Sequence, residues 1–304
     1  MKKFISKIGL FSLLLLVVSI SIDYSFTMVF KNGNTNKTQW LSRINNRSFD
    51  VAILGNSRSW WNIDLNLFNK ELELNCISLS DNHFPYSEML LRLKQFYSNN
   101  NSMKLLLLQT EYWSLFNQEQ GFSMTVYDNI PYLDDSTTYN YLSLRSDEWK
   151  KLKYIPLWRY AEFNRQWGIE EFLITLLDKR NTIFDSTGTF FSNNKFYGNQ
   201  SINFSPIKSF KINPDFIAIY KFCKSHDIRL CAYTAPIYNV NFHRGSQQRM
   251  EIYFDSLGVE YRNYMNTFQD SSFFNDNTHL SISGGKYFTD TLLHYTKLLI
   301  EHPY

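Results

Sequence analysis

Short apolar segments alternate along this chain with segments of amphipathic, helical spacing, and this alternation constrains the fold more than any other feature. The apolar segments, each expected to be a strand, are residues 51–54, 72–79, 104–108, 228–234 and 259–261. The expected helices are residues 63–72, a segment opened by Pro85, and residues 214–225, 247–257 and 284–300. Strands that are apolar along their whole length are typical of a parallel sheet with helices on both faces. The sequence therefore predicts a three-layer α/β/α fold with a mostly parallel sheet.

The pattern also indicates how the chain is organised. It breaks down between about residues 112 and 210, where the sequence is aromatic, Asn-rich and Ser-rich and only two helices are expected, at 157–165 and 169–177. Aromatic residues make up 17% of the 304 residues, so the chain should fold rather than remain disordered. We expect one α/β domain over residues 48–304, with an insertion at about 112–210 and a polar linker at 31–47 before it.

The N-terminal segment is typical of a membrane anchor or a signal peptide. Lys2, Lys3 and Lys7 precede an uncharged stretch at 8–22, rich in Leu, Ile and Val, and a second apolar patch follows Asp23. No small-x-small cleavage site follows convincingly, which favours an uncleaved anchor over residues 1–30. Basic residues before the apolar stretch place the N-terminus in the cytoplasm and the rest of the chain outside. A buried core helix of a cytosolic protein would explain the apolar residues but not the asymmetry of charge.

Two distant motifs carry the residue types of a nucleophilic serine site. Ser57 lies in Gly55-Asn56-Ser57 directly after the first expected strand, and Asp276-x-x-His279 precedes the last expected helix. A serine hydroxyl becomes nucleophilic when an imidazole takes its proton and a carboxylate orients the imidazole. We therefore expect Ser57, His279 and Asp276 to meet at the carboxyl edge of the sheet. A serine at a helix start also serves as an ordinary cap, and that interpretation stays open here.

With these motifs the chain resembles the SGNH/GDSL hydrolase superfamily. It is most similar to the membrane-anchored branch that includes alginate O-acetylation and D-alanine-transfer proteins of bacterial envelopes. The resemblance rests on Gly55-Asn56-Ser57-Arg58 and on Asp276 and His279, although Asn56 stands where the family more often has Asp. It implies a flavodoxin-like sheet, Ser57 as nucleophile, His279 as general base and Asp276 as the group that orients it.

The resemblance also implies an oxyanion hole, and here the sequence departs from the family. The backbone N–H of Ser57 should contribute, together with a glycine after the second strand and an asparagine after the third. This chain offers Ser80 or Asp81 at the first position and Gln109 as the nearest amide at the second. A backbone N–H survives any side chain except proline. The departures leave a slow, specialised or inactive member as an alternative.

Other residues near the expected strand ends have two interpretations each. Arg58 either holds a carboxylate or phosphate of an acceptor or makes a surface ion pair. Trp60 and Trp113, like Trp61 and Tyr112, either stack on sugar rings or belong to the core.

Metal and cysteine chemistry have weaker signals. Histidines show no H-E-x-x-H and no paired spacing with Cys, so no metal site and no cofactor is expected, although Asp276 and His279 have i, i+3 spacing. The three cysteines are expected to be buried thiols, with a bridge between Cys223 and Cys231 left open for an oxidising compartment.

These observations lead to one functional hypothesis and two rivals. We expect an extracytoplasmic, membrane-tethered serine esterase or O-acyltransferase, with acetyl as the expected acyl group and a cell-surface glycan as substrate. The resemblance adds a membrane-embedded acyltransferase as a partner. A net charge of +3, from scattered basic and acidic residues, argues against nucleic acid. The rivals are a catalytically inactive glycan-binding or scaffold protein of an envelope polysaccharide-modification system, and a cytosolic lipase-like enzyme.

Overall fold

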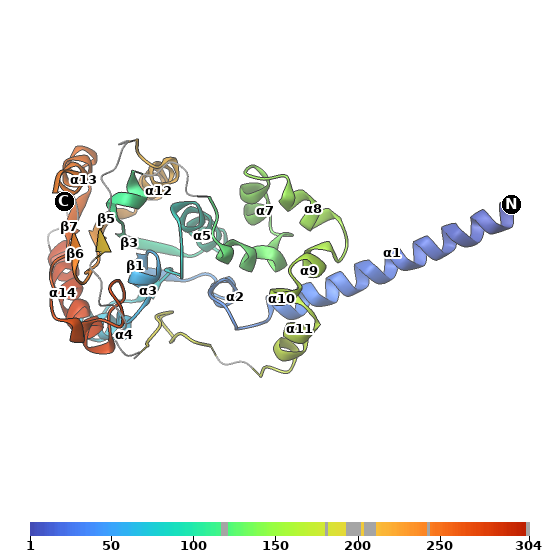
Figure 1. Cartoon of the computed structure of the whole chain (residues 1–304), viewed down its shortest axis with the longest axis horizontal. Helices are drawn as coiled ribbons and strands as arrows, with labels where there is room; N and C mark the ends of the chain where they lie inside the picture. Colours follow the sequence, from blue (N-terminus) through green and yellow to red (C-terminus); the bar gives the residue numbers. More distant parts are fainter. Residues whose placement is uncertain (117–120, 180–181, 193–201, 204–210, 242–243, 302–304) are drawn as a thin grey trace. The chain divides into compact units, whose positions relative to one another are not determined.

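The computed structural model describes residues 1–116, 121–179, 182–192, 202–203, 211–241 and 244–301 (Figure 1). The chain forms two compact units. A helical unit contains Met1–Ile44 and Val126–Thr182, and a sheet unit contains Asn45–Thr125 and Ile183–Tyr304. Residues 193–201 and 204–210, which fall in the expected insertion, lie outside the described residues.

The sheet unit is built on five parallel strands in the order β2-β1-β3-β5-β7. The strands are β1 (Ser48–Leu54), β2 (Cys76–Ser78), β3 (Ser102–Gln109), β5 (Arg229–Thr234) and β7 (Glu260–Asn263). Counted along the chain, this is the 2-1-3-4-5 order of a flavodoxin-like sheet, in which ligands bind where the strand order reverses. Here that point lies between β1 and β3. A separate pair, β4 (Ile202–Asn203) with β6 (Val240–Asn241), is also parallel.

Helices cover both faces of this sheet. They are α3 (Ser57–Trp60), α4 (Leu65–Leu72), α5 (Tyr86–Ser98), α6 (Tyr112–Leu115), α12 (Pro214–Ser225), α13 (Arg244–Leu257), the 3-10 turn η2 (Ser271–Phe273) and α14 (Ile282–Glu301). The step from β1 to β2 runs opposite to every later step, so right-handed crossovers put α4 on one face and α5, α12 and α13 on the other. Contacts between α4 and α14 place the last helix on the α4 face. The three-layer α/β/α architecture is as predicted.

The core on the α4 face shows why these strands are apolar throughout. Val51 and Ile53 of β1 lie beside Leu105 and Leu107 of β3, and all four pack in one cluster with α4 and α14. Ala52, Leu54, Leu106 and Leu108, which alternate with them, are also buried, since the opposite face is covered too. Each large apolar side chain that is buried contributes roughly 1.5–3 kcal/mol to stability. Because so many are buried here, this sheet is the main stabilising layer.

The helical unit contains α1 (Lys2–Lys31), α2 (Lys37–Ser42), η1 (Met124–Tyr132), α7 (Ser136–Ser143), α8 (Glu148–Tyr154), α9 (Trp158–Glu162), α10 (Asn164–Trp167) and α11 (Ile169–Leu176). Within the described residues, α1 alone is long and apolar enough to cross a membrane. Its residues 2–18 are exposed, whereas Thr27 and Phe30 near its end are buried.

Most expected elements are found within a few residues of their predicted bounds, and the exceptions have local causes. The strand expected at 72–79 is wrong in its first half, because Glu73 adopts a left-handed conformation that ends α4 and only Cys76–Ser78 pairs. The stretch expected as a linker contains α2, which starts with a capping box formed by Asn36 and Gln39. All three cysteines are free and buried, so the bridge left open between Cys223 and Cys231 is not formed.

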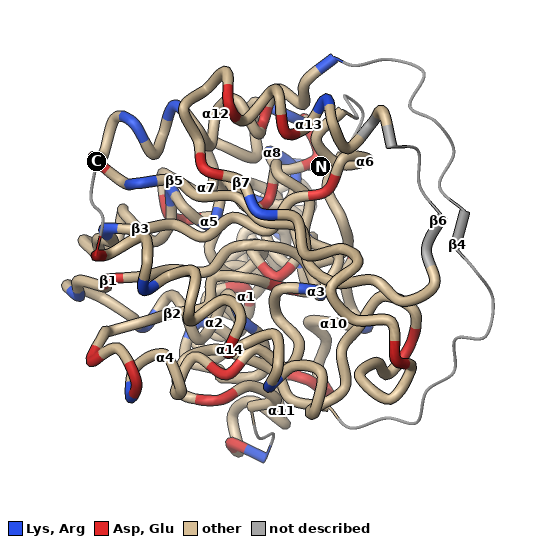
Figure 2. The backbone as a smooth tube through the Cα atoms, turned by 90° about the vertical axis from the view of Figure 1, so that its left-hand side faces the viewer, with Lys and Arg blue, Asp and Glu red and all other residues tan. Residues whose placement is uncertain are grey.

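Charges are interspersed along the backbone in Figure 2, with Lys and Arg alternating with Asp and Glu. This distribution agrees with the small net charge of +3.

Two glycines allow close backbone approaches at the start of the last helix, Gly285 to the loop that follows α3 and Gly284 to η2. A Cβ on Gly285 would lie 2.1 Å from the carbonyl oxygen of Asn62, and a Cβ on Gly284 would lie 1.9 Å from that of Phe273. Asn62 in turn donates from its side-chain amide to the carbonyl of Leu280. The segment before α14 is therefore fixed against the chain that follows Ser57.

We predict that Gly285→Ala destabilises the protein by about 1–3 kcal/mol, because the added methyl forces the two backbones apart. The gain of up to about 1 kcal/mol in helix propensity is too small to offset this overlap. The free energy of unfolding in urea measures the effect, and Lys286→Ala, at the exposed neighbouring position, is the control. Equal stability of both variants would contradict the close approach.

Glu88 on α5 is a buried acid whose ionisation depends on folding. Its side chain is 2% exposed and accepts hydrogen bonds from the N–H of Ser123 and, at 2.6 Å, the hydroxyl of Thr125. Burial raises the pKa of Glu88 to about 7, although these hydrogen bonds and Arg92 act in the opposite direction.

We predict that the stability advantage of a neutral side chain at position 88 grows with pH. The folded state keeps the proton up to about pH 7, whereas the unfolded chain loses it near its ordinary pKa of 4.5. The contribution of wild-type Glu88 is therefore complete below pH 4.5 and falls as pH rises through 7, by up to roughly 3 kcal/mol. Unfolding of wild type and Glu88→Gln at pH 4.5 and 8 measures it, and a difference that does not change with pH would refute it.

Candidate active site

Ser57 is the first residue of α3, directly after the turn that ends β1. A Cβ on Gly55 would lie 2.6 Å from Cβ of Gln109, so only glycine lets this turn pass so close to β3. The side chain of Asn56, not that of Ser57, caps the helix, accepting from the N–H of Arg58 at 3.0 Å. The capping interpretation of Ser57 is therefore wrong, and its hydroxyl is available for another partner.

That partner is His279, on the segment between η2 and α14. Nε2 of His279 lies 2.8 Å from Oγ of Ser57, and Nδ1 lies 2.8 Å from Oδ2 of Asp276. The structure thus brings the three residues together, although Ser57 and His279 are 222 positions apart in the sequence. With the proton on Nδ1 donated to Asp276, the Nε2 lone pair faces the serine hydroxyl, which is the arrangement needed for a general base.

Asp276 holds its own loop as well as the imidazole. Oδ1 accepts hydrogen bonds from the backbone N–H of Thr278 at 2.7 Å and of His279 at 2.9 Å, while Oδ2 faces the ring. Burial by itself would raise the pKa of Asp276, but the hydrogen bonds from His279 and Thr278 outweigh it and hold the pKa well below the ordinary value. Asp276 therefore stays ionised at neutral and mildly acidic pH and favours the proton on Nδ1.

Trp61, the residue after α3, lies against the face of this imidazole. The ring centroids of Trp61 and His279 are 4.5 Å apart with planes inclined by 33°. A ring held on its face and at Nδ1 keeps little rotational freedom, so Trp61 helps to fix the direction of Nε2. The sequence places Trp61 among the aromatics near strand ends but does not indicate His279 as its partner.

The other two tryptophans considered for sugar binding differ in their surroundings. Trp60 is 6% exposed and donates from its indole N–H to the carbonyl of Gly188 at 3.0 Å, so it belongs to the core. Trp113 is half-buried and lies over the guanidinium of Arg58, with 5.9 Å from Cζ to the ring centroid.

Arg58 is buried and engaged within the protein. It pairs with the buried carboxylate of Glu111 and donates to the carbonyls of Ala235 and Pro236. Burial lowers the pKa of the guanidinium to about 9, so the side chain is still charged at neutral pH. This position fits neither a surface ion pair nor a group that reaches an acceptor molecule. It ties the turn after β1 to the ends of β3 and β5.

The candidate oxyanion donors are not equally available. The N–H of Asp81 donates to the carbonyl of Gly55 at 3.2 Å, and Gln109 accepts from the N–H of Asn56 and donates to Glu111. Within the part of the chain that the structure describes, the backbone N–H groups of Ser57 and Ser80 have no hydrogen-bond acceptor. These two groups, one after β1 and one after β2, are the candidate donors to an anionic oxygen; Ser57 lines the cavity at the site, whereas Ser80 is fully buried.

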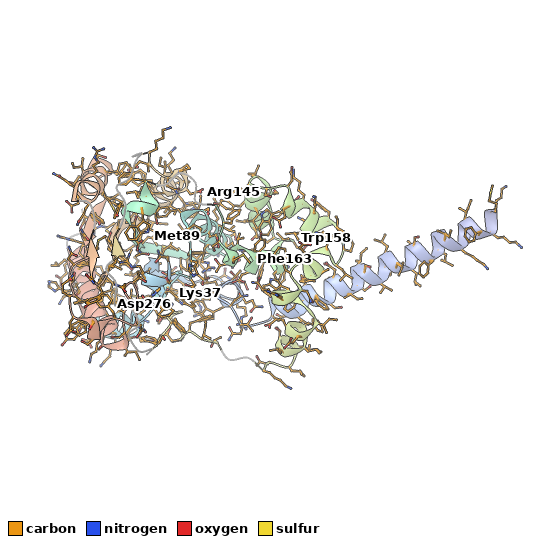
Figure 3. The ribbon with its side chains drawn as sticks, viewed as in Figure 1. Lys37, Met89, Arg145, Trp158, Phe163 and Asp276 are labelled. Carbon is orange, nitrogen blue, oxygen red and sulfur yellow. The ribbon has the colours of Figure 1, made fainter. Side chains whose placement is uncertain are left out.

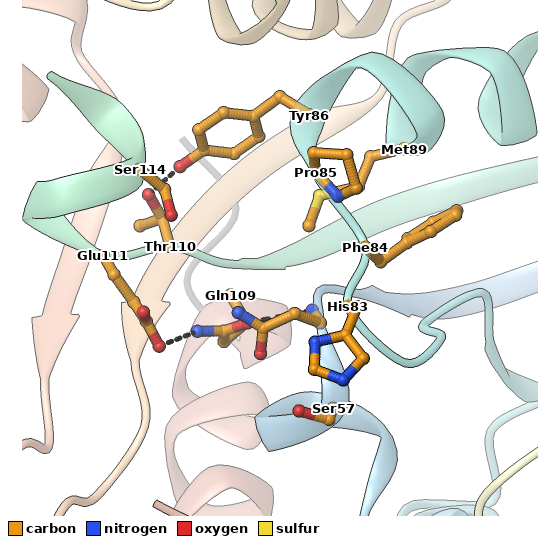
Figure 4. Close-up of a pocket in the computed structure, with 11 residues that line it drawn as sticks. Ser57, His83, Phe84, Pro85, Tyr86, Met89, Gln109, Thr110, Glu111 and Ser114 are labelled. Atoms are coloured by element: carbon orange, nitrogen blue, oxygen red, sulfur yellow. Dashed lines mark hydrogen bonds between the residues drawn. The ribbon is translucent and has the colours of Figure 1, made fainter. Parts of the chain in front are cut away.

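A cavity of about 220 Å³ opens beside Ser57 (Figure 4). Its lining comes from the ends of β1 and β3 and from the segment that leads into α5, and consists of Asn56, Ser57, His83, Phe84, Pro85, Tyr86, Met89, Gln109, Thr110, Glu111 and Ser114. It therefore lies at the point where the strand order reverses, where open α/β sheets bind ligands. Hydroxyl, amide and carboxylate groups outnumber apolar side chains along it.

His83 and Glu111 line this cavity and were not singled out from the sequence. His83 is exposed, has a left-handed backbone with φ of 45° and lies close to Ser57 in Figure 4. The available signal was positional, since Glu111 lies two residues after β3 and His83 five residues after β2, and the carboxyl ends of these strands converge.

Metal-ligating side chains do not cluster among the described residues, in which no group of three or more His, Cys, Asp or Glu comes together. The facing atoms of Asp276 and His279 contact each other and Ser57 instead.

Comparison with known proteins gives matches only among solved structures, since no family model and no curated protein match the chain. Three of these structures are a proposed acylhydrolase from Bacteroides fragilis NCTC 9343, a GDSL-like lipase from Bacteroides thetaiotaomicron VPI-5482 and an active-site mutant of a family two carbohydrate esterase from Clostridium thermocellum in complex with cellohexaose. In that order they are 9%, 9% and 8% identical, with TM-scores of 0.36, 0.37 and 0.35. The matches cover 88%, 91% and 85% of this chain and 93%, 100% and 65% of theirs. Similarity this low carries no argument about the site.

We predict that Trp61→Ala slows labelling of Ser57 by a fluorophosphonate by roughly ten- to a hundred-fold, because a freely rotating imidazole is misplaced by an ångström or more. Trp61→Phe keeps a ring against His279 and should retain most of the rate. Second-order labelling rates of the purified full-length variants measure both. Equal rates for Ala and wild type would show that Trp61 does not position the imidazole.

Proposed function

We propose that the protein is a serine esterase or O-acyltransferase that uses Ser57 as nucleophile. The observation that carries the proposal is the continuous hydrogen-bonded chain from Oγ of Ser57 through both ring nitrogens of His279 to Asp276. This arrangement makes an otherwise weak hydroxyl nucleophilic at neutral pH.

The proposed reaction has two steps. Oγ of Ser57 attacks the acyl carbonyl while His279 takes the serine proton at Nε2, and the N–H groups of Ser57 and Ser80 face the resulting oxyanion. The C–O bond to the leaving alcohol then breaks, and His279 returns the proton to that alcohol. In the second step water or a sugar hydroxyl loses its proton to His279 and attacks the acyl-serine. The bond between the acyl carbon and Oγ of Ser57 then breaks, His279 returns the proton to Oγ, and the acid or the acylated sugar is released.

The cavity supports a short acyl group and a polar substrate. A volume of about 220 Å³ suits acetyl and part of a sugar better than a long lipid chain, and the polar lining offers partners to hydroxyl groups. We therefore propose an O-acetylated cell-surface glycan as the substrate class.

We propose that α1 is an uncleaved membrane anchor and that the bulk of the protein is extracytoplasmic. Thr27 and Phe30 of α1 are buried in the helical unit, and Asp23 pairs with Arg159, so removal of α1 would expose part of that unit. Signal peptides are discarded without such a role. A membrane-embedded acyltransferase as partner remains a proposal from the family resemblance.

One observation favours the rival proposal of an inactive glycan-binding or scaffold protein. The side-chain amide of Gln109 already donates to Glu111 at 2.8 Å, which leaves only two backbone donors for an oxyanion. Loss of one such donor typically costs about 3 kcal/mol in the transition state, which slows a reaction greatly.

We predict that Ser57→Ala lowers hydrolysis of 4-nitrophenyl acetate by at least about a thousand-fold, because no other described side chain is paired with His279 Nε2. Ser59→Ala is the matched control, since Ser59 lies on the same turn but bonds to Tyr233. Turnover by Ser57→Ala equal to that of wild type would exclude this site.

The fluorophosphonate probe separates the two proposals. Labelling of wild type but not of Ser57→Ala supports a serine enzyme, whereas a folded wild-type protein that does not label supports the scaffold.

A further inference from the structure

The helix α1 changes character at Asp23. Every residue from Met1 to Val18 is exposed, and the uncharged stretch that begins at Ile8 ends at Asp23. Beyond Asp23 the helix packs into the helical unit, with Thr27 and Phe30 buried. If α1 crosses a bilayer, Asp23 marks the level at which the helix leaves the hydrocarbon, since an ionised carboxylate does not remain there.

Asp23 holds one particular loop at that level. Its carboxylate accepts from the backbone N–H of Leu157 at 2.9 Å and from the guanidinium of Arg159. Arg159 also donates to the hydroxyl of Thr27 at 2.9 Å and to the carbonyl of Ile130 at 3.3 Å. The charge of Asp23 is therefore neutralised within the helical unit, and the chain around Leu157 is fixed beside the exit of α1.

The fixed segment is Tyr154-Ile155-Pro156-Leu157-Trp158, here named loop 154–158. Tyr154, Ile155 and Trp158 are 66%, 46% and 45% exposed, although all three are large and partly or wholly apolar. Leu157 has a left-handed backbone with φ of 64°, an uncommon conformation for a leucine, and its hydrogen bond to Asp23 holds it there. Figure 3 shows Trp158 at the end of the helical unit from which α1 extends.

The residues in and around loop 154–158 are of the types found at the interface between a membrane and water. The loop is hydrogen-bonded through Leu157 to Asp23, where the exposed apolar part of α1 ends, and Lys151 and Lys153 lie just before it on α8. Trp and Tyr side chains are enriched at both membrane–water interfaces, and the long stems of lysines let their charges stay at the headgroup level. The exposed apolar residues of α11 lie beside later turns, because Phe172 stacks on Phe26 at 4.4 Å, and they are not part of the inference.

We propose that loop 154–158 is a membrane-contacting surface that inserts Ile155 and Trp158 into the headgroup and outer acyl region of the bilayer that α1 crosses. The inference rests on the proposed role of α1 as an anchor. It adds a second contact, which fixes the rotation of the helical unit about α1 and its height above the bilayer.

Spin-label accessibility in the full-length protein tests this inference. Single-cysteine substitutions Ile155→Cys, Trp158→Cys, Leu13→Cys and Asn32→Cys are labelled with a nitroxide and reconstituted into phosphatidylethanolamine–phosphatidylglycerol bilayers. The three native cysteines are buried and should not compete. Leu13 reports on the anchor itself, and exposed Asn32, about 13 Å beyond Asp23 along α1, is the aqueous control. Collision with oxygen, which concentrates in lipid, is compared with collision with a water-soluble nickel chelate.

We expect labels at 155 and 158 to favour oxygen over nickel relative to the label at 32, as the label at 13 does more strongly. If the label at 13 is in lipid but those at 155 and 158 meet nickel as freely as the label at 32, the inference is overturned and the anchor stands. If labels at 155 and 158 are shielded from both reagents, a protein surface covers the loop and the inference is again overturned. If the label at 13 also meets nickel freely, the anchor itself fails.

Discussion

The candidate site depends on the contact between Asn62 and the segment before α14, which positions His279 beside Ser57. Ser57 and His279 lie near opposite ends of the sequence of the sheet unit. Each is on a short segment whose position depends on contacts with other parts of the chain. Asn62 sets it, through its amide to the Leu280 carbonyl and through a backbone approach that glycine at 285 permits. A polar contact and a missing side chain, together with the packing of Phe274 and Leu280 in the apolar core, bring the hydroxyl and the imidazole to 2.8 Å.

Around that contact, buried polar groups fix the conformations of the loops through hydrogen bonds and an ion pair. Asp276 uses one oxygen for its own turn and the other for His279, so loop geometry and imidazole orientation cannot vary independently. Arg58 and Glu111 form an ion pair beside the cavity, where removal of either partner would leave an uncompensated charge. Sites assembled in this way are stiff, which suits a reaction that needs a hydroxyl and a base in fixed register.

The sequence predicted the sheet because apolar strands carry a strong, local signal. It also predicted which serine, histidine and aspartate would meet, since strand-end position and the two motifs constrain each other. It did not predict that Arg58 is buried or that Trp61 faces His279, because both depend on which neighbour arrives from elsewhere in the chain. The cap by Asn56 is local, but Ser57 is an equally favoured cap residue, so the sequence did not distinguish the two. The helices expected at 157–165 and 169–177 match α9, α10 and α11, whereas α7 and α8 were missed because segments of seven or eight residues hold too few turns for a clear amphipathic pattern.

The buried thiols have a consequence for how the chain matures. Burial raises the pKa of Cys76, Cys223 and Cys231 to about 12, so none carries appreciable thiolate once the protein is folded. Thiol oxidation and thiol–disulfide exchange both proceed through the thiolate. The folded protein should therefore react little with oxidants or disulfides around it. A polypeptide delivered unfolded across a membrane could reach this structure without an oxidase or an isomerase, provided that its sheet closes over the three sulfurs before they meet an oxidant.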